Sequence, residues 1–111
     1  MLTINKFTTI AESCGFSAGE PQKQGKQRYI EISQYTPAGE DWYETIWFKN
    51  VGDIINSIWE RIENWDSDDE AEVWINQRGT RGVPQSIRTL LDDQDWKVSK
   101  LKELHLQLTK A

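Results

Sequence analysis

Apolar residues spaced by three or four positions open the chain. One side of a helix over residues 4–14 is formed by Ile4, Phe7, Ala11 and Cys14. Gly15 follows this stretch and is a residue type that commonly ends a helix. Residues 16–27 contain two glycines and a proline among polar side chains, and they show neither helical nor strand periodicity. We therefore expect a helix followed by a loop.

A β-hairpin is predicted next. Residues 28–35 and 42–48 are rich in aromatic and β-branched residues, and residues 36–41 between them have the composition of a turn. Both faces of the second strand are apolar, because Trp42 and Trp47 fall on opposite faces. Such a strand is either covered on both sides or leaves an adhesive face exposed.

Two amphipathic helices are predicted in the middle of the chain. The first begins at Asp53, which we expect to cap it. Its apolar stripe consists of Ile54, Ile55, Ile58, Trp59 and Ile62. The second begins after Ser67, because Ser67 and Glu70 have the spacing of a capping box. Its apolar residues are Ala71, Val73, Trp74 and Ile75.

Two glycines and Pro84 interrupt the helical pattern in residues 78–84. Beyond them we expect a short helix around Leu90 and, after Asp92 and Asp93, a separate C-terminal helix. The apolar residues of that last helix are Trp96, Leu101, Leu104 and Leu108. These elements predict a single α+β domain over residues 1–111, in which a small antiparallel β-hairpin or sheet packs against about four or five short helices.

Charge narrows the classes of partner. The 111 residues include 13 Lys and Arg and 18 Asp and Glu, which gives a net charge of −5. An acidic chain repels the phosphate backbone, so direct nucleic-acid binding is not expected. Residues 40–72 carry most of the negative charge. The acidic residues around the predicted junction of two helices, which we call the acidic corner, are Glu63, Asp66, Asp68, Asp69, Glu70 and Glu72.

The acidic corner has three interpretations. In the first, the corner is a solvated helix start, because carboxylates interact favourably with the positive end of the helix dipole. Alternatively, it presents carboxylates in place of phosphates to a basic groove of a protein that handles DNA. A calcium loop is disfavoured, because Ala71 stands where the loop needs Gly and Gln77 where it needs Glu.

Catalytic and metal-binding signatures are missing from the sequence. His105 is the one histidine and Cys14 the one cysteine, which is too few for a structural zinc site. We expect Cys14 to be a buried core residue and His105 to lie on a helix surface. Arg78, Arg81 and Arg88 either hold an anion or pair with the acidic corner. We therefore predict no enzyme activity, no metal and no cofactor.

Six tryptophans are many for this length. Trp59 and Trp74 lie on helical stripes, where core packing explains them, whereas Trp42 or Trp47 is a candidate anchor for a protein partner. The first residues lack the pattern of a secretion signal, and no apolar run approaches the length of a membrane span. We expect a cytoplasmic protein without membrane contact, either a monomer or a homodimer.

Three stretches of the chain resemble small uncharacterised proteins encoded on conjugative transposons, plasmids and phages. The stretches are residues 35–42, which open the second strand, residues 66–74 and residues 82–93. The resemblance implies an accessory protein of a mobile element, a setting in which small acidic proteins often disarm restriction or CRISPR nucleases. It carries over no functional residues.

Two functions are therefore predicted. The first is a non-catalytic inhibitor that binds a nucleic-acid-directed defence protein through the acidic corner, with Trp42 or Trp47 as an apolar anchor. The alternative is a structural or regulatory interaction module that contacts its protein partner through the Trp-rich hairpin.

Overall fold

The computed structural model describes residues 1–67, 69–70 and 87–111. These residues form an α+β fold with a four-stranded antiparallel sheet and three helices. The elements, in chain order, are α1 (Ile4–Ser13), β1 (Ser17–Ala18), β2 (Gln22–Gln24), β3 (Gln27–Tyr35), β4 (Asp41–Phe48), α2 (Asp53–Glu63) and α4 (Ile87–Thr109). The predicted fold class is confirmed, but four or five helices are more than the described residues contain.

The predicted hairpin is β3 and β4, which pair in antiparallel register from Arg28 opposite Phe48 to Tyr35 opposite Asp41. Both strands begin one residue earlier than expected. The prediction of a loop over residues 16–27 was wrong in part, because β1 and β2 pair with β3 there. All three residues of β2 are exposed, so its backbone pairs with β3 without any apolar alternation in the sequence.

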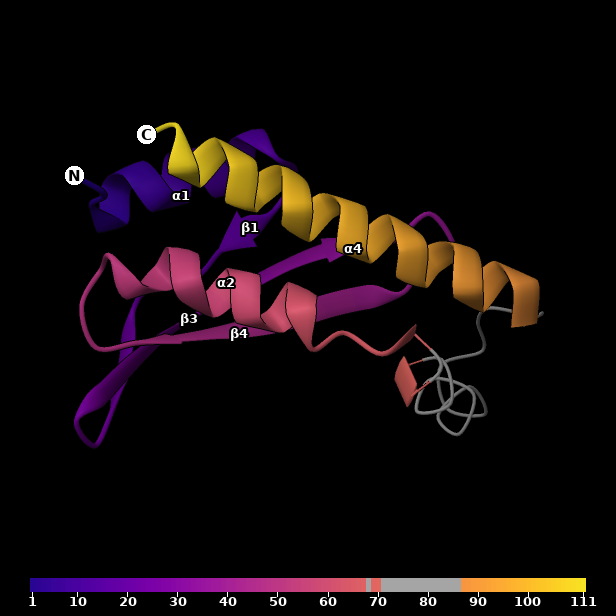
Figure 1. The fold of residues 1–111 in the computed structure, drawn as a ribbon, viewed down its shortest axis with the longest axis horizontal. Coiled ribbons are helices and arrows are strands. Elements are labelled where there is room, and N and C mark those ends of the chain that lie inside the picture. Colours follow the sequence, from indigo (N-terminus) through magenta and orange to yellow (C-terminus); the bar gives the residue numbers. More distant parts are fainter. Residues whose placement is uncertain (68, 71–86) are drawn as a thin grey trace.

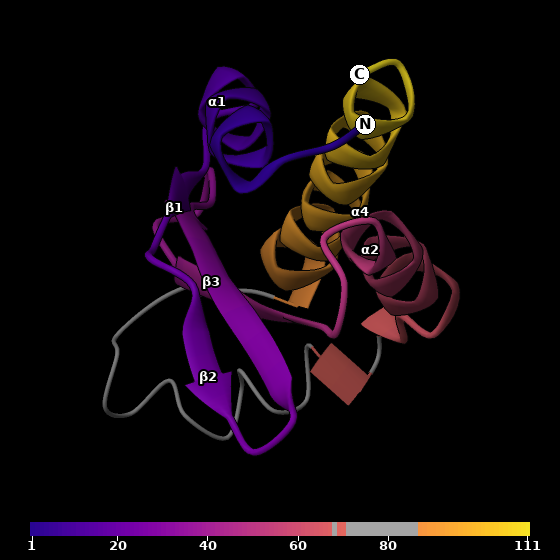
Figure 2. The same ribbon diagram turned by 90° about the vertical axis from the view of Figure 1, so that its left-hand side faces the viewer.

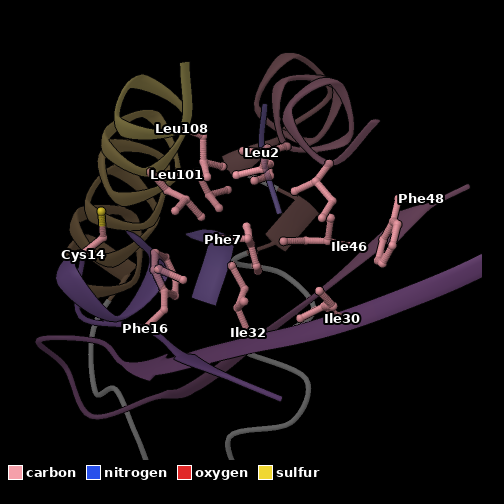
Figure 3. Close-up of a cluster of buried hydrophobic side chains, with 14 of the residues drawn as sticks. Leu2, Phe7, Cys14, Phe16, Ile30, Ile32, Ile46, Phe48, Leu101 and Leu108 are labelled. Carbon is pink, nitrogen blue, oxygen red and sulfur yellow. The ribbon is translucent and has the colours of Figure 1, made fainter. Parts of the chain in front are cut away.

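Helices cover one face of the sheet. In Figures 1 and 2, α1, α2 and α4 all lie on the same side of the strands. The even-numbered positions of β3 and β4 point toward these helices, and most of them are buried. Figure 3 shows side chains from this face meeting residues of α1 and α4 in one hydrophobic cluster. The fully buried members of the cluster include Phe7, Ile30, Ile32, Ile54 and Leu104.

The helices α1 and α2 largely follow the prediction. Thr3 caps α1, since its Oγ1 accepts a hydrogen bond from the backbone N–H of Lys6 at 3.1 Å. The expected cap of α2 was wrong: Gly52 occupies the cap position and Asp53 is the first helical residue. Asp53 accepts a hydrogen bond from the N–H of Asn50 at 2.9 Å, which fixes the turn before the helix.

The last helix corrects two predictions. Residues predicted as two helices separated at Asp92 and Asp93 form the continuous helix α4. Asp93, Gln94 and Lys97 are buried on the same face as Leu90 and Leu101. These polar residues occupy part of the buried face, so the regular spacing of apolar residues is interrupted although the helix continues.

Buried polar contacts attach the β3–β4 turn to α4. Thr36 Oγ1 donates to Asp93, and the same carboxylate accepts the backbone N–H of Ala38 at 3.2 Å. One turn further along α4, Lys97 Nζ lies 2.8 Å from the carboxylate of Glu40. These contacts compensate the burial of Thr36, Asp93 and Lys97, which would otherwise cost free energy, whereas the amide of Gln94 is buried without a hydrogen-bond partner among the described residues. They also fix the end of the hairpin to the helical layer.

Part of the predicted third helix lies outside the described residues. Ser67, Asp69 and Glu70 are helical, and the N–H of Glu70 donates to the carbonyl of Asp66 at 3.0 Å. The expected apolar residues at positions 71 and 73–75, and the break over residues 78–84, are beyond the described part of the chain. Within residues 1–67, 69–70 and 87–111, no helix is both long and apolar enough to cross a membrane.

Candidate functional site

The face of the sheet opposite the helices carries four aromatic side chains. The odd-numbered positions of β3 and β4 point to this side, since successive strand residues alternate between faces. We call the aromatic residues there the outer aromatic face; they are Tyr29, Tyr35, Tyr43 and Trp47. None of the described helices lies over this face (Figure 2). The second apolar face of β4 is therefore exposed, which is one of the two alternatives that the sequence left open.

Exposure along the outer aromatic face increases toward the turn. Trp47 is 40% exposed and packs on Tyr29, with 4.9 Å between the ring centroids. Tyr43 is 54% exposed and Tyr35 is 71% exposed. Tyr43 donates a hydrogen bond from its hydroxyl to Asp41 at 3.1 Å. That hydrogen bond, together with the negative charge of Asp41, raises the pKa of Tyr43 above its ordinary value.

Trp42 lies on the other side of β4 from Trp47. It is 3% exposed and packs among aromatic rings, with Phe16 at 5.4 Å and Trp96 at 6.1 Å between centroids. Its indole N–H donates to Glu44 at 2.7 Å, so its polar atom is satisfied inside the protein. Of the two predicted anchors, Trp47 is therefore available to a partner and Trp42 is not.

The expectation that core packing explains Trp59 was wrong. Its side chain is 44% exposed and its ring packs on His105, with 4.9 Å between the centroids. His105 itself lies within α4 and is half-buried. Cys14 lies in the core at 2% exposure, as predicted, and burial raises the pKa of its thiol. Among the described side chains, no group of three or more His, Cys, Asp or Glu is arranged to hold a metal ion.

A groove of about 270 Å³ separates β4 from α2. It is lined by residues 44–47 of β4, by Ser57, Ile58 and Glu60 of α2, and by Leu101 of α4. Ser57 Oγ donates to the carbonyl of Trp47 at 2.6 Å, so α2 is tied to the strand beside the groove. The lining combines the apolar residues Ile46, Ile58 and Leu101 with the charged residues Glu44, Glu60 and Arg61.

Arg61 closes the rim of this groove. Its guanidinium binds Glu44 through two hydrogen bonds of 2.7 and 3.1 Å, and it also donates to Glu70 at 2.8 Å. The ring centroid of Trp65 lies 4.1 Å from the guanidinium carbon. Burial lowers the pKa of Arg61, but the hydrogen bonds and charges of Glu44 and Glu70 outweigh this effect and leave that pKa raised. The positive charge of Arg61 is therefore already matched by two carboxylates.

The structure distributes the predicted site residues unevenly. In the acidic corner, Glu63, Asp66 and Asp69 are exposed, whereas Glu70 is half-buried and paired with Arg61. Asp68 and Glu72 lie outside the described residues, as do two of the three candidate anion-binding residues, Arg78 and Arg81. The third, Arg88, is exposed near the start of α4.

No tyrosine was among the predicted site residues. Tyr29, Tyr35 and Tyr43 share the face of Trp47 because all four stand at odd-numbered positions of two strands paired in this register. The signal was present as the two-residue period of the hairpin, which places these side chains together once the strands are aligned.

Comparisons with known proteins leave the site to be interpreted from its own geometry. No protein-family model, no curated protein and no solved structure matches the chain.

Proposed function

We propose that this protein is a non-catalytic interaction module that binds a protein partner through the outer aromatic face. The observation that carries the proposal is a sheet with one face covered by helices and four aromatic side chains on the other. Exposed apolar patches on a folded protein mark interaction sites. Tyr and Trp residues supply much of the binding free energy in such sites.

The charges around the outer aromatic face favour a protein over a nucleic acid. Aromatic side chains on a sheet also stack on bases in single-stranded nucleic-acid sites, but those sites are lined with positive charge. Here Glu31 is exposed on the same face and Asp41 lies at its end, bound to Tyr43. A phosphate backbone would meet these carboxylates, whereas a protein with Lys or Arg at its rim would pair with them.

Capture from a cell lysate with the tagged full chain tests this proposal. The test variant is Y35S/Y43S, which removes two exposed rings without entering the core. The matched control is L106S, because Leu106 is also exposed, at 52%, but lies on α4. We expect a protein that wild type and L106S retain and that Y35S/Y43S loses. Retention of the same proteins by all three chains would contradict the proposal.

A second candidate function uses the acidic corner. We propose it as the inhibition of a nucleic-acid-directed defence protein of restriction or CRISPR type, in the setting of a mobile element. The supporting observation is that Glu63 and Asp69 are exposed while Arg61, the nearby cation, is bound by two other carboxylates. The exposed carboxylates thus keep their charge available to a basic surface.

Charge reversal distinguishes this candidate from the first. The test variant is E63K/D69K, and the control is E12K, which reverses an exposed charge on α1. Binding through the acidic corner should weaken steeply with salt and be lost in E63K/D69K, while Y35S/Y43S retains it. A partner held equally by E63K/D69K and wild type would rule out the acidic corner.

A further inference from the structure

The edge of β4 that faces away from β3 carries no strand in the described part of the chain. β4 occupies one edge of β3 along its full register, so β1 and β2 pair with the opposite edge of β3. β4 is therefore an edge strand. An uncovered edge presents unpaired N–H and C=O groups, which form a template for another extended segment.

The hydrogen-bonding pattern identifies which backbone groups point outward. Thr36 N–H donates to the carbonyl of Glu40 at 2.9 Å, so these two residues form a hydrogen-bonded pair. Alternation along an antiparallel ladder then makes the next residue of β4, Asp41, and every second residue after it turn its backbone groups away from β3. Tyr43 and Thr45 belong to this set. Trp47 does too, which agrees with the hydrogen bond that its carbonyl accepts from Ser57 on α2.

Two residues of the set are accessible. Tyr43 and Thr45 are both exposed, and no described residue hydrogen-bonds to their outward N–H or C=O groups. Thr45 also lines the groove between β4 and α2. An extended segment placed against Thr45 would therefore make ladder hydrogen bonds on one side and direct alternate side chains into the groove.

The geometry points to strand addition: we propose that a protein partner places an extended segment beside β4, along the groove that β4 forms with α2, and pairs with the free edge at Tyr43 and Thr45. This goes beyond the proposed function, because it concerns a second surface of β4, its free edge, and does not depend on the outer aromatic face. The groove, about 270 Å³, holds about nine times the volume of a water molecule in the liquid. One or two apolar side chains of the segment match this volume, which Ile46, Ile58 and Leu101 line although each is at most 5% exposed.

Charge defines the rest of the segment. Glu44 and Glu60 line the groove, and the guanidinium of Arg61 is already bound by Glu44 and Glu70. The rim therefore has excess negative charge, which favours Lys or Arg beside the apolar residue of the segment. A second copy of this chain fits less well. A twofold pairing of two β4 edges would bring two α2 helices, each tied to its own edge by Ser57, to the same side of the joined sheet.

Hydrogen exchange of the free protein is the first test. Amide exchange followed by NMR should be fast for the outward N–H groups of Tyr43 and Thr45 and slow for those of Glu44 and Ile46, which bond to β3. Equal protection at all four positions would overturn the proposal, because the edge would then be covered.

The second test uses peptides selected by the full chain from a random phage-displayed library and then synthesised. The variant is Thr45→Pro, which deletes the outward N–H and is compatible with an edge strand. The control is Thr45→Val, which keeps both the N–H and the β-branched shape. We expect Thr45→Pro to weaken the peptides by at least about tenfold and Thr45→Val by less than about threefold. In the wild-type protein, the peptides should slow exchange at Tyr43 and Thr45, a readout that does not depend on how the proline variant folds.

Each outcome separates the two surfaces. Peptides lost by Thr45→Pro and kept by Y35S/Y43S support strand addition and show that these peptides do not use the outer aromatic face. Peptides lost by Y35S/Y43S alone, with no protection of the Thr45 amide, overturn strand addition and leave the proposed function standing. Recovery of no peptide that protects the edge also overturns strand addition.

Discussion

The buried pair of Lys97 and Glu40 allows a sharp test of how the hairpin is held on α4. The side chain of Lys97 is 3% exposed and that of Glu40 is 12% exposed, and their charged groups lie 2.8 Å apart. Glu40→Leu leaves the ammonium group of Lys97 buried without its acceptor. Lys97→Met leaves the carboxylate of Glu40 largely buried without its donor. Breaking a buried pair from one side destabilises a protein by about 3–5 kcal/mol.

The magnitude is large against the total. A domain of this size unfolds with about 5–15 kcal/mol, and about 1 kcal/mol shifts its melting temperature by about 4 °C. Each single variant should therefore melt about 12–20 °C lower than wild type. The double variant Glu40→Leu/Lys97→Met buries two apolar side chains in place of two charges, so we expect it to recover most of the loss.

Chemical denaturation of the four chains measures this coupling as a double-mutant cycle. The matched control is the more exposed pair Lys100 and Glu103, whose side chains are 26% and 46% exposed and whose charged atoms lie 3.4 Å apart. Lys100→Met should cost less than about 1 kcal/mol. The reasoning fails if the double variant is as unstable as the sum of the single variants, or if Lys97→Met costs no more than Lys100→Met.

Three further predictions follow from single contacts. Native Cys14 should react with a thiol reagent at least about tenfold more slowly than in denaturant, because burial hides the thiol and raises its pKa; equal rates would contradict its burial. Asp41→Asn should lower the pKa of Tyr43, followed by NMR of labelled tyrosine, since the anion that stabilises the neutral phenol is removed; an unchanged titration would exclude the hydrogen bond as its cause. Arg61→Met should reduce the free energy of unfolding by about 1–2 kcal/mol, because its two carboxylates lose a partly exposed cation; a gain in stability would show that the pair is unfavourable.

Periodicity predicted the elements whose burial rests on apolar side chains. The helix at Ile4–Ser13 and the two strands of the hairpin follow from spacing alone, because each buries one regular row of apolar residues. β2 could not be found this way, since its Gln and Lys side chains are all exposed and only backbone pairing holds it. Its formation depends on β3, a partner that local sequence does not specify.

Polar residues in the core explain the misplaced break in α4. The buried face of this helix runs through Leu90, Gln94, Lys97, Leu101 and Leu104, a spacing of four and three residues without interruption. Two of these positions are polar, so a search for apolar residues alone stops at them. Lys97 is tolerated there because Glu40 reaches it from the hairpin, a contact between residues 57 positions apart. Sequence patterns of one helix cannot contain that information.

The candidate site was predicted only in part, because it too depends on how distant segments are arranged. The apolar residues on both sides of β4 left two alternatives, a strand covered on both sides or an exposed face, and the choice between Trp42 and Trp47 needed the position of the helices. The free edge of β4 was not predictable, because sheet order is a property of the assembled fold. Residue type identified the chemistry of the surface, whereas its boundaries required the tertiary structure.

The outer aromatic face and the free edge share β4, and several contacts fix this strand to the helices. The residue before β4, Glu40, is paired with Lys97 of α4, and Glu44 in the middle of the strand is paired with Arg61 of α2. Near the end of β4, the carbonyl of Trp47 accepts a hydrogen bond from Ser57 of α2. A strand that is already ordered loses little conformational entropy when a partner binds. Burying polar groups in α4 is costly in itself, but here it positions a strand whose outer face and free edge both remain open. The same contacts that stabilise the hairpin therefore also prepare it for binding.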